Sequence, residues 1–169
     1  MLIACFDEQG EARIILTKRP ETMPSHQGEI VFPGGKHEPE LDADLRATAL
    51  REAHEEIGLD PMTVEMLAEL DSIITVASRF VLTPFVGLLP ARPNLARDPT
   101  EVVSVFDVAI SELLDDAAYR EERWDVPPEL GAGAGRNRSI HFFELADETV
   151  WGATARILAS FLTHLTEER

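Results

Sequence analysis

Three glutamates near the middle of the chain, Glu52, Glu55 and Glu56, are spaced by three and four residues. On an α-helix, which turns about 100° per residue, such positions share one side of the helix. Apolar residues gather on the adjoining side: Ala49, Leu50, Ala53 and Ile57. The helix is therefore expected to bury one stripe and to present three carboxylates beside it on an exposed face.

Close carboxylates repel one another, which costs an isolated helix roughly a few tenths of a kcal/mol for each pair. A hard divalent cation would remove this cost, and Mg²⁺ prefers a few carboxylates together with waters and phosphate oxygens. Two such ions about 4 Å apart could hold a diphosphate and activate a water. The alternative interpretation is an acidic helix face that contacts only water.

The residues around the glutamates favour the metal site. Asp42 or Asp44 can cap the N-terminus of the predicted helix, and Gly58 can end it in the left-handed conformation. Ahead of the helix, a short strand at residues 30–32 ends in a Pro-Gly-Gly turn at residues 33–35. Because glycine lets the backbone approach a ligand closely, this turn indicates a ligand site next to the glutamates.

The segment from Arg51 to Leu59 resembles the end of the Nudix box, the motif of the Nudix hydrolases. The family pattern is Arg-Glu-apolar-x-Glu-Glu-x-Gly-apolar, and every fixed position of it is present here. The resemblance implies a Nudix-type α/β/α sandwich with a mixed β-sheet, and an enzyme that hydrolyses a phosphoanhydride with the help of Mg²⁺ or Mn²⁺.

The front half of the box differs from the family pattern. His37 and Ala43 stand where the family has a glycine and a glutamate, and the loop before Arg51 is two residues longer. In the family that glutamate supports the arginine. We therefore expect Asp42 or Asp44 to support Arg51 instead.

The resemblance also implies roles for the acidic residues. Glu52 and Glu56 are the expected metal ligands, with Glu55 as a third and the carbonyl oxygen of Gly34 or Gly35 as a fourth. These residues and Arg51 would form the catalytic group.

A carboxylate must also accept the proton of the attacking water. Glu52 is one candidate. Many relatives use a glutamate outside the box, and the candidate for that role is Glu101, which precedes an apolar segment at residues 102–106. The alternative for Glu101 is a charge at the edge of a surface strand.

Further segments look like the signature of the coenzyme A pyrophosphatases. They are residues 16–19 (Leu-Thr-Lys-Arg), 26–29, 32–35 (Phe-Pro-Gly-Gly), 140–143 and 151–155. This resemblance implies cleavage of coenzyme A, or an acylated or oxidised form of it, to 3′,5′-ADP and 4′-phosphopantetheine. The alternatives are hydrolysis of another nucleoside diphosphate derivative, such as ADP-ribose or a dinucleotide, and a binding module that has lost catalysis.

Basic residues near this signature are candidates for phosphate contacts. Lys18, Arg19 and His26 would supply local positive charge to an acidic protein, and Arg79 is a further candidate. Gly34 and Gly35 would complete the substrate site through their backbone. The alternatives are a solvated Lys18–Arg19 pair and a His26 that hydrogen-bonds only to its own loop.

Composition limits the class of protein. The chain has 169 residues, of which 44% are hydrophobic and 27% charged, as in an ordinary globular protein with one domain over residues 1–169. The net charge of -16 disfavours binding to nucleic acid. Cys5 is the single cysteine, so no intramolecular disulfide can form. No signal peptide or membrane-spanning run is visible, so we expect a cytoplasmic protein with a small-molecule partner, and a homodimer is left open.

Hydrophobic patterns predict strands alternating with a few helices. The expected strands are residues 2–6, 12–17, 30–32, 71–76, 81–88, 101–108 and 140–145. Besides the acidic helix, helices are expected at residues 110–114 and 149–165, and a mobile glycine-rich surface loop at residues 131–135. These elements indicate an α/β protein in which helices cover a mixed sheet.

Overall fold

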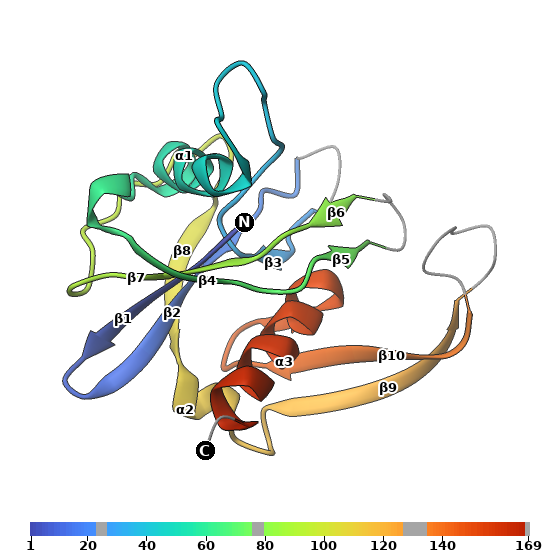
Figure 1. The fold of residues 1–169 in the computed structure, drawn as a ribbon. Coiled ribbons are helices and arrows are strands. Elements are labelled where there is room, and N and C mark those ends of the chain that lie inside the picture. Colours follow the sequence, from blue (N-terminus) through green and yellow to red (C-terminus); the bar gives the residue numbers. More distant parts are fainter. Residues whose placement is uncertain (23–26, 76–79, 127–134, 168–169) are drawn as a thin grey trace.

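The computed structural model describes residues 1–22, 27–75, 80–126 and 135–167 (Figure 1). Its helices are α1 (Leu45–Ile57), α2 (Ile110–Leu113) and α3 (Gly152–Glu167), with a short 3₁₀ turn at Pro61–Thr63. Its strands are β1 (Leu2–Glu8), β2 (Glu11–Lys18), β3 (Ile30–Val31), β4 (Glu65–Glu69), β5 (Ile73–Ile74), β6 (Val81–Leu82), β7 (Phe85–Leu88), β8 (Ser104–Ala109), β9 (Tyr119–Val126), β10 (Gly135–Glu144) and β11 (Thr149–Trp151). His26, Arg79 and the predicted loop up to residue 134 lie outside the described residues.

The main sheet is mixed. Its strand order is β3-β2-β1-β7-β4, and β8 pairs with β2. The β1–β7 pair is parallel and the β1–β2 pair is antiparallel. The β1–β2 hairpin turns at Gln9 and Gly10, both with positive φ (59° and 85°), which matches the right-handed twist of the strands. The predicted opening hairpin is therefore confirmed.

Helices cover both faces of this sheet, as the alternation along β2 requires. Ile15 points to the face covered by α1, where it packs in a core with Ala53 and Ile57. Ile14 and Leu16 point to the other face and pack with residues of α3. Figure 1 shows α1 and α3 on opposite sides of the sheet. The expected α/β layer arrangement is confirmed.

Some predicted element bounds were wrong. The strand predicted at 81–88 is divided into β6 and β7, because Pro84 has no N–H to donate to a ladder. The helix predicted at 149–165 begins only at Gly152, whose positive φ of 65° separates it from β11. Before Gly152, β11 pairs with β10 instead of continuing the helix.

Other strands differ in length or were not predicted. The strand predicted at 101–108 begins at Ser104, the strand predicted at 71–76 is reduced to β5, and the strand predicted at 140–145 begins at Gly135. Strands β4 and β9 were not predicted, because most of their residues are exposed on both faces and so show no alternation of polar and apolar residues. No helix in the described part of the chain is long and apolar enough to cross a membrane.

Candidate functional site

Helix α1 has the caps that its sequence predicts. The Asp44 side chain accepts a hydrogen bond from the backbone N–H of Ala47 at 2.8 Å, so Asp44 and not Asp42 is the N-cap. Gly58 adopts the left-handed conformation (φ 68°), and its N–H donates to the carbonyl of His54 at 2.8 Å. The predicted acidic helix is confirmed between these two residues.

Asp42 supports Arg51. Nε of Arg51 donates to Oδ1 of Asp42 at 2.8 Å, and Nη2 donates to Oδ2 at 3.0 Å. The same carboxylate accepts hydrogen bonds from the backbone N–H of Glu38 and the hydroxyl of Thr48, both at 2.9 Å. Its side chain is only 1% exposed. The Arg51 guanidinium, followed by these other donors, holds the pKa of Asp42 well below its ordinary value.

Arg51 in turn orients two of the glutamates. Its guanidinium lies 2.8 Å from Oε1 of Glu52 and 2.7 Å from Oε2 of Glu55, and it also donates to the carbonyl of Lys36 at 3.2 Å. A planar fork held by Asp42 on one edge can fix carboxylates on the others. Arg51 therefore fixes the positions of the Glu52 and Glu55 carboxylates.

The three glutamates differ in exposure, which corrects the expectation of one exposed acidic face. The side chain of Glu55 is 52% exposed and that of Glu52 13%, whereas Glu56 as a residue is 3% exposed. Glu56 is buried because the turn at residues 33–35 covers it, and the N–H of Gly34 donates to its Oε2 at 3.0 Å.

Burial shifts the pKa of both inner carboxyls. Burial raises the pKa of Glu56 to about 7; the N–H of Gly34 and the charge of Arg19 oppose this rise, while the charges of Glu52 and Glu101 add to it. Burial also raises the pKa of Glu52, against the effect of Arg51 and with help from Glu55 and Glu101. Burial thus makes both carboxyls harder to ionise than ordinary glutamates.

The glycine turn lies directly against these carboxylates. A Cβ atom added to Gly35 would stand 2.2 Å from Oε2 of Glu52, closer than any real contact. Gly34 has a φ of 151°, and the N–H of Leu2 donates to the carbonyl of Pro33 at 2.8 Å, which ties the turn to β1. The predicted close approach of the glycine backbone therefore takes place at Glu52.

We predict that Gly35→Ala displaces the Glu52 carboxylate, because the added methyl and the carboxylate cannot occupy the same space. Turnover should fall at least about tenfold, as is common when a reacting group is misplaced by about 1 Å. Steady-state kinetics with a crystal structure of the variant would check this. Unchanged turnover with Glu52 in its original position would contradict it.

The structure brings Arg19 and Glu101 close to Glu56. The N–H of Val103 donates to the carbonyl of Lys18, and the N–H of Asp98 donates to the carbonyl of Glu56, both at 2.8 Å. These bonds hold residues 98–103 between the ends of β2 and α1. The charges of Arg19 and Glu101 consequently both act on Glu56.

Nε of Arg19 is buried and has no hydrogen-bond partner within the described residues. Buried donors of this kind usually have a hydrogen-bond partner, so the missing partner indicates a place for a ligand. A phosphate oxygen would suit this donor.

Lys18 does not lie with Arg19 and Glu101 near the inner glutamates. Its ammonium pairs with Glu148, which precedes β11 on the opposite face of the sheet. Neighbouring residues of a strand point to opposite faces, so Lys18 and Arg19 cannot both face α1.

The sequence as a whole matches one family. The sequence model of the NUDIX domain covers residues 1–130. The chain belongs to the NUDIX domain family. A relative from Arabidopsis thaliana, Nudix hydrolase 22, chloroplastic, is 40% identical over 94% of this chain and 52% of its own length. Nudix hydrolase NudL of Photorhabdus laumondii is 35% identical over 86% of this chain and 73% of its own. The chain thus spans about half the length of the plant relative.

Solved structures of other Nudix proteins share the fold. A MutT/nudix family protein from Enterococcus faecalis superposes with a TM-score of 0.58, at 14% identity, over 97% of this chain and 60% of its own. The NUDIX domain of Shewanella oneidensis NrtR, solved with ADP ribose, superposes with a TM-score of 0.51, at 17% identity, over 67% of this chain and 72% of its own. At these identities the likeness concerns the fold alone.

Nudix hydrolases generally use divalent metal ions, and the donor chemistry of this site fits one. Glu52 and Glu56 offer hard oxygen ligands, and a cation bound between them would offset the cost of burial that raises their pKa values. No group of three or more His, Cys, Asp or Glu side chains is arranged around a common metal position in the described part of the chain. There, Glu52 instead pairs with Arg51, and Glu56 accepts from Gly34.

Proposed function

We propose that this Nudix protein is a pyrophosphohydrolase that uses Mg²⁺ or Mn²⁺ to cleave the diphosphate of coenzyme A, giving 3′,5′-ADP and 4′-phosphopantetheine. The observation that carries the proposal is the glycine turn packed against Glu52 and Glu56, together with the nearby Arg19, whose buried Nε has no hydrogen-bond partner among the described residues. Acidic side chains can bind cations, and the arginine can bind the phosphate that those cations accompany.

The glutamates have distinct roles in this proposal. Glu52 and Glu56 would hold the metal, with Glu55 as a third ligand and the carbonyl of Gly35 as a further oxygen donor. When bound, the metal would neutralise the diphosphate and make a water more acidic. Arg51 does not touch the substrate; it fixes the directions of Glu52 and Glu55.

Arg19 is proposed to bind the diphosphate. It stands at the end of β2, and its charge lowers the pKa of Glu56, so its guanidinium is near the inner carboxylate. A phosphate oxygen on Nε would complete its hydrogen bonding, and the guanidinium would offset part of the negative charge of the diphosphate. Lys18 is left out of this role because Glu148 already neutralises it.

Glu101 is the proposed proton acceptor. Two observations support this role: Glu101 is exposed, and its charge raises the pKa of both Glu52 and Glu56. A solvent-facing carboxylate can take a proton from the attacking water and release it to bulk water.

We predict that Glu101→Gln lowers the maximal rate by about a hundredfold, the usual size of a general-base contribution, while metal affinity changes less. The amide keeps the shape of the side chain but cannot accept the proton. Pre-steady-state kinetics combined with a Mn²⁺ titration would separate the two effects. A rate and a pH–rate profile like those of the unchanged protein would place the proton acceptor elsewhere.

Coenzyme A is proposed over other diphosphates because the signature at residues 16–19 and 32–35 supplies both Arg19 and the glycine turn of this site. ADP-ribose is the second candidate, since the NrtR domain with the same fold was solved with that ligand. The cytoplasmic location, the single domain, the homodimer and the lack of nucleic-acid binding stay predictions.

A substrate panel tests the proposal. Coenzyme A, dephospho-coenzyme A, ADP-ribose and a diadenosine polyphosphate are compared at equal concentration with Mg²⁺, and products are identified by mass. We expect the highest kcat/KM for coenzyme A. Preference for ADP-ribose or for the dinucleotide would overturn the choice of substrate but would leave a diphosphate hydrolase in place.

A further inference from the structure

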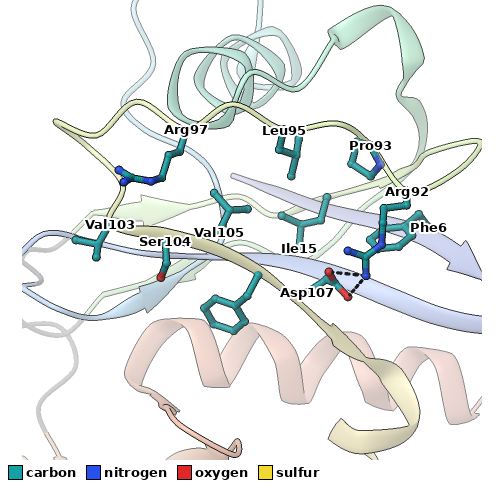
Figure 2. A pocket seen from close by; sticks show the side chains of 11 residues that line it. Phe6, Ile15, Arg92, Pro93, Leu95, Arg97, Val103, Ser104, Val105 and Asp107 are labelled. Atoms are coloured by element: carbon teal, nitrogen blue, oxygen red, sulfur yellow. Dashed lines mark hydrogen bonds and ion pairs between the residues drawn. The ribbon is translucent and has the colours of Figure 1, made fainter.

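A pocket of about 500 Å³ lies beside the site, between residues 92–97 and strand β8 (Figure 2). Its floor includes Ile15 of β2 and Val105 of β8, and Leu95 stands above them. None of the residues predicted to act in catalysis or phosphate binding lines it. A pocket of this size falls within the range that holds small ligands.

Strand register makes the pocket floor continuous with the phosphate site. In the β2–β8 ladder, Ile15 pairs with Asp107 and Thr17 pairs with Val105. Alternate residues of a strand share a face, so Ile15 and Thr17 both point to the α1 face of β2, and Arg19 follows directly after the end of the strand. At the pocket end where Figure 2 shows Arg97, the N–H of Val103 binds the carbonyl of Lys18, the residue before Arg19. A ligand on Arg19 can therefore extend into the pocket.

The charges in the pocket leave one arginine without a carboxylate. At the end of the pocket away from Arg97, Arg92 pairs with Glu8 and with Asp107, and Asp107 also pairs with Arg13. Two arginines and two carboxylates neutralise each other there. Arg97 makes a single hydrogen bond, from Nη1 to the carbonyl of Val102 at 2.8 Å, and forms no ion pair with any described residue.

We propose that this pocket holds the nucleoside end of the substrate, and that Arg97 binds a phosphate carried on its ribose. The inference rests on the proposed function. A flat base would contact the apolar side chains of Leu95 and Val105, and the phosphate would meet Arg97, the cation of the pocket that forms no ion pair with a described residue. The pantetheine arm fits less well, because it carries no phosphate beyond the diphosphate and would leave Arg97 without an anion. Arg97 would thereby distinguish coenzyme A from dephospho-coenzyme A.

The test compares Arg97→Gln with Arg123→Gln, which removes the same charge from an exposed arginine of β9. For Arg97→Gln, kcat/KM for coenzyme A should fall about tenfold to a hundredfold, the effect of one charge-assisted hydrogen bond. With dephospho-coenzyme A it should change less than about threefold, since that substrate lacks the phosphate. Arg123→Gln should behave as the unchanged protein with both substrates. An equal loss on both substrates, or no loss on either, would overturn the assignment.

A binding measurement separates this inference from the proposed function. Metal-free protein is titrated with 3′,5′-ADP and with 5′-AMP while amide NMR shifts are followed. The inference expects shifts at Leu95 and Val105, tighter binding of 3′,5′-ADP, and loss of this preference in Arg97→Gln. Val103→Trp, at a half-exposed position lining the pocket, should block both nucleotides. Equal affinity for the two nucleotides, or shifts confined to other regions, would refute the pocket even if coenzyme A is cleaved. Failure to cleave any diphosphate would instead refute the proposed function.

Discussion

Replacing Glu56 by glutamine is expected to lower turnover by at least about a hundredfold and, at the same time, to raise the melting temperature of the metal-free protein at mildly alkaline pH. The loss of turnover follows from removal of a metal-binding charge. The gain in stability follows from burial, because Glu56 is 3% exposed and burial outweighs the opposing effects of the Gly34 N–H and the Arg19 charge on its ionised form. The glutamine oxygen can still accept the hydrogen bond from Gly34.

The sign of the pH dependence follows from the pKa. That of Glu56 rises from an ordinary 4.5 to about 7 on folding, so the folded protein holds this proton more tightly than the unfolded chain. The stabilising contribution of Glu56 to the free energy of unfolding is therefore fully present below about pH 4.5 and is lost as pH rises through about 7. The free energy of unfolding falls by roughly 3 kcal/mol over this range, because one pKa unit corresponds to about 1.4 kcal/mol. Glu56→Gln should remove this decline, and Mg²⁺ should stabilise the unchanged protein far more than the variant.

Calorimetry from pH 5 to about pH 8, with and without Mg²⁺, checks this prediction. Glu55→Gln is the matched control, because that side chain is 52% exposed and should show neither the stabilisation nor the full loss of turnover. Glu52→Gln should lose turnover as Glu56→Gln does. Full turnover of both the Glu52 and Glu56 variants at saturating Mg²⁺ would refute the metal assignment.

Asp42→Ala is expected to impair both folding stability and catalysis. The substitution leaves two N–H groups of the Arg51 guanidinium without their carboxylate, leaves the N–H of Glu38 without its acceptor, and removes one of the acceptors of the Thr48 hydroxyl. Removing one partner of a buried pair is strongly destabilising. Because Arg51 orients Glu52 and Glu55, turnover should also fall, by at least about tenfold.

Asp44→Ala is the control for this prediction. It removes an aspartate two positions away and costs the helix its N-cap, about 1 kcal/mol, but leaves Arg51 untouched. Thermal unfolding and kinetics of the two variants are compared under identical conditions. If Asp44→Ala lowers turnover as much as Asp42→Ala, the loss reflects general helix stability and not the support of Arg51.

The parts of the site that the sequence could predict are local ones. The limits of α1 follow from Asp44 and Gly58, whose side-chain and backbone preferences act within a few residues. The close approach at Gly35 follows from the conformational freedom of glycine beside a helix of matching pattern.

Other parts depend on contacts between distant segments. Asp42 and Asp44 are equally plausible partners for Arg51 by position, and only the path of the loop decides between them. Glu56 is buried by a turn 22 residues earlier, and Lys18 is neutralised by Glu148, 130 residues later. Strand β9 is exposed on both faces, so hydrophobic alternation, which reports burial, gives no signal there.

The most direct test of the account is a single reaction. Purified protein is incubated with coenzyme A and Mg²⁺ in water enriched in oxygen-18, with a parallel sample in EDTA, and the products are identified by mass. We expect 3′,5′-ADP and 4′-phosphopantetheine in equal amounts, with one heavy oxygen in only one of them, and no products in EDTA. Thermal stabilisation by Mg²⁺ without cleavage of coenzyme A or of any other diphosphate would contradict the account and would indicate a binding module.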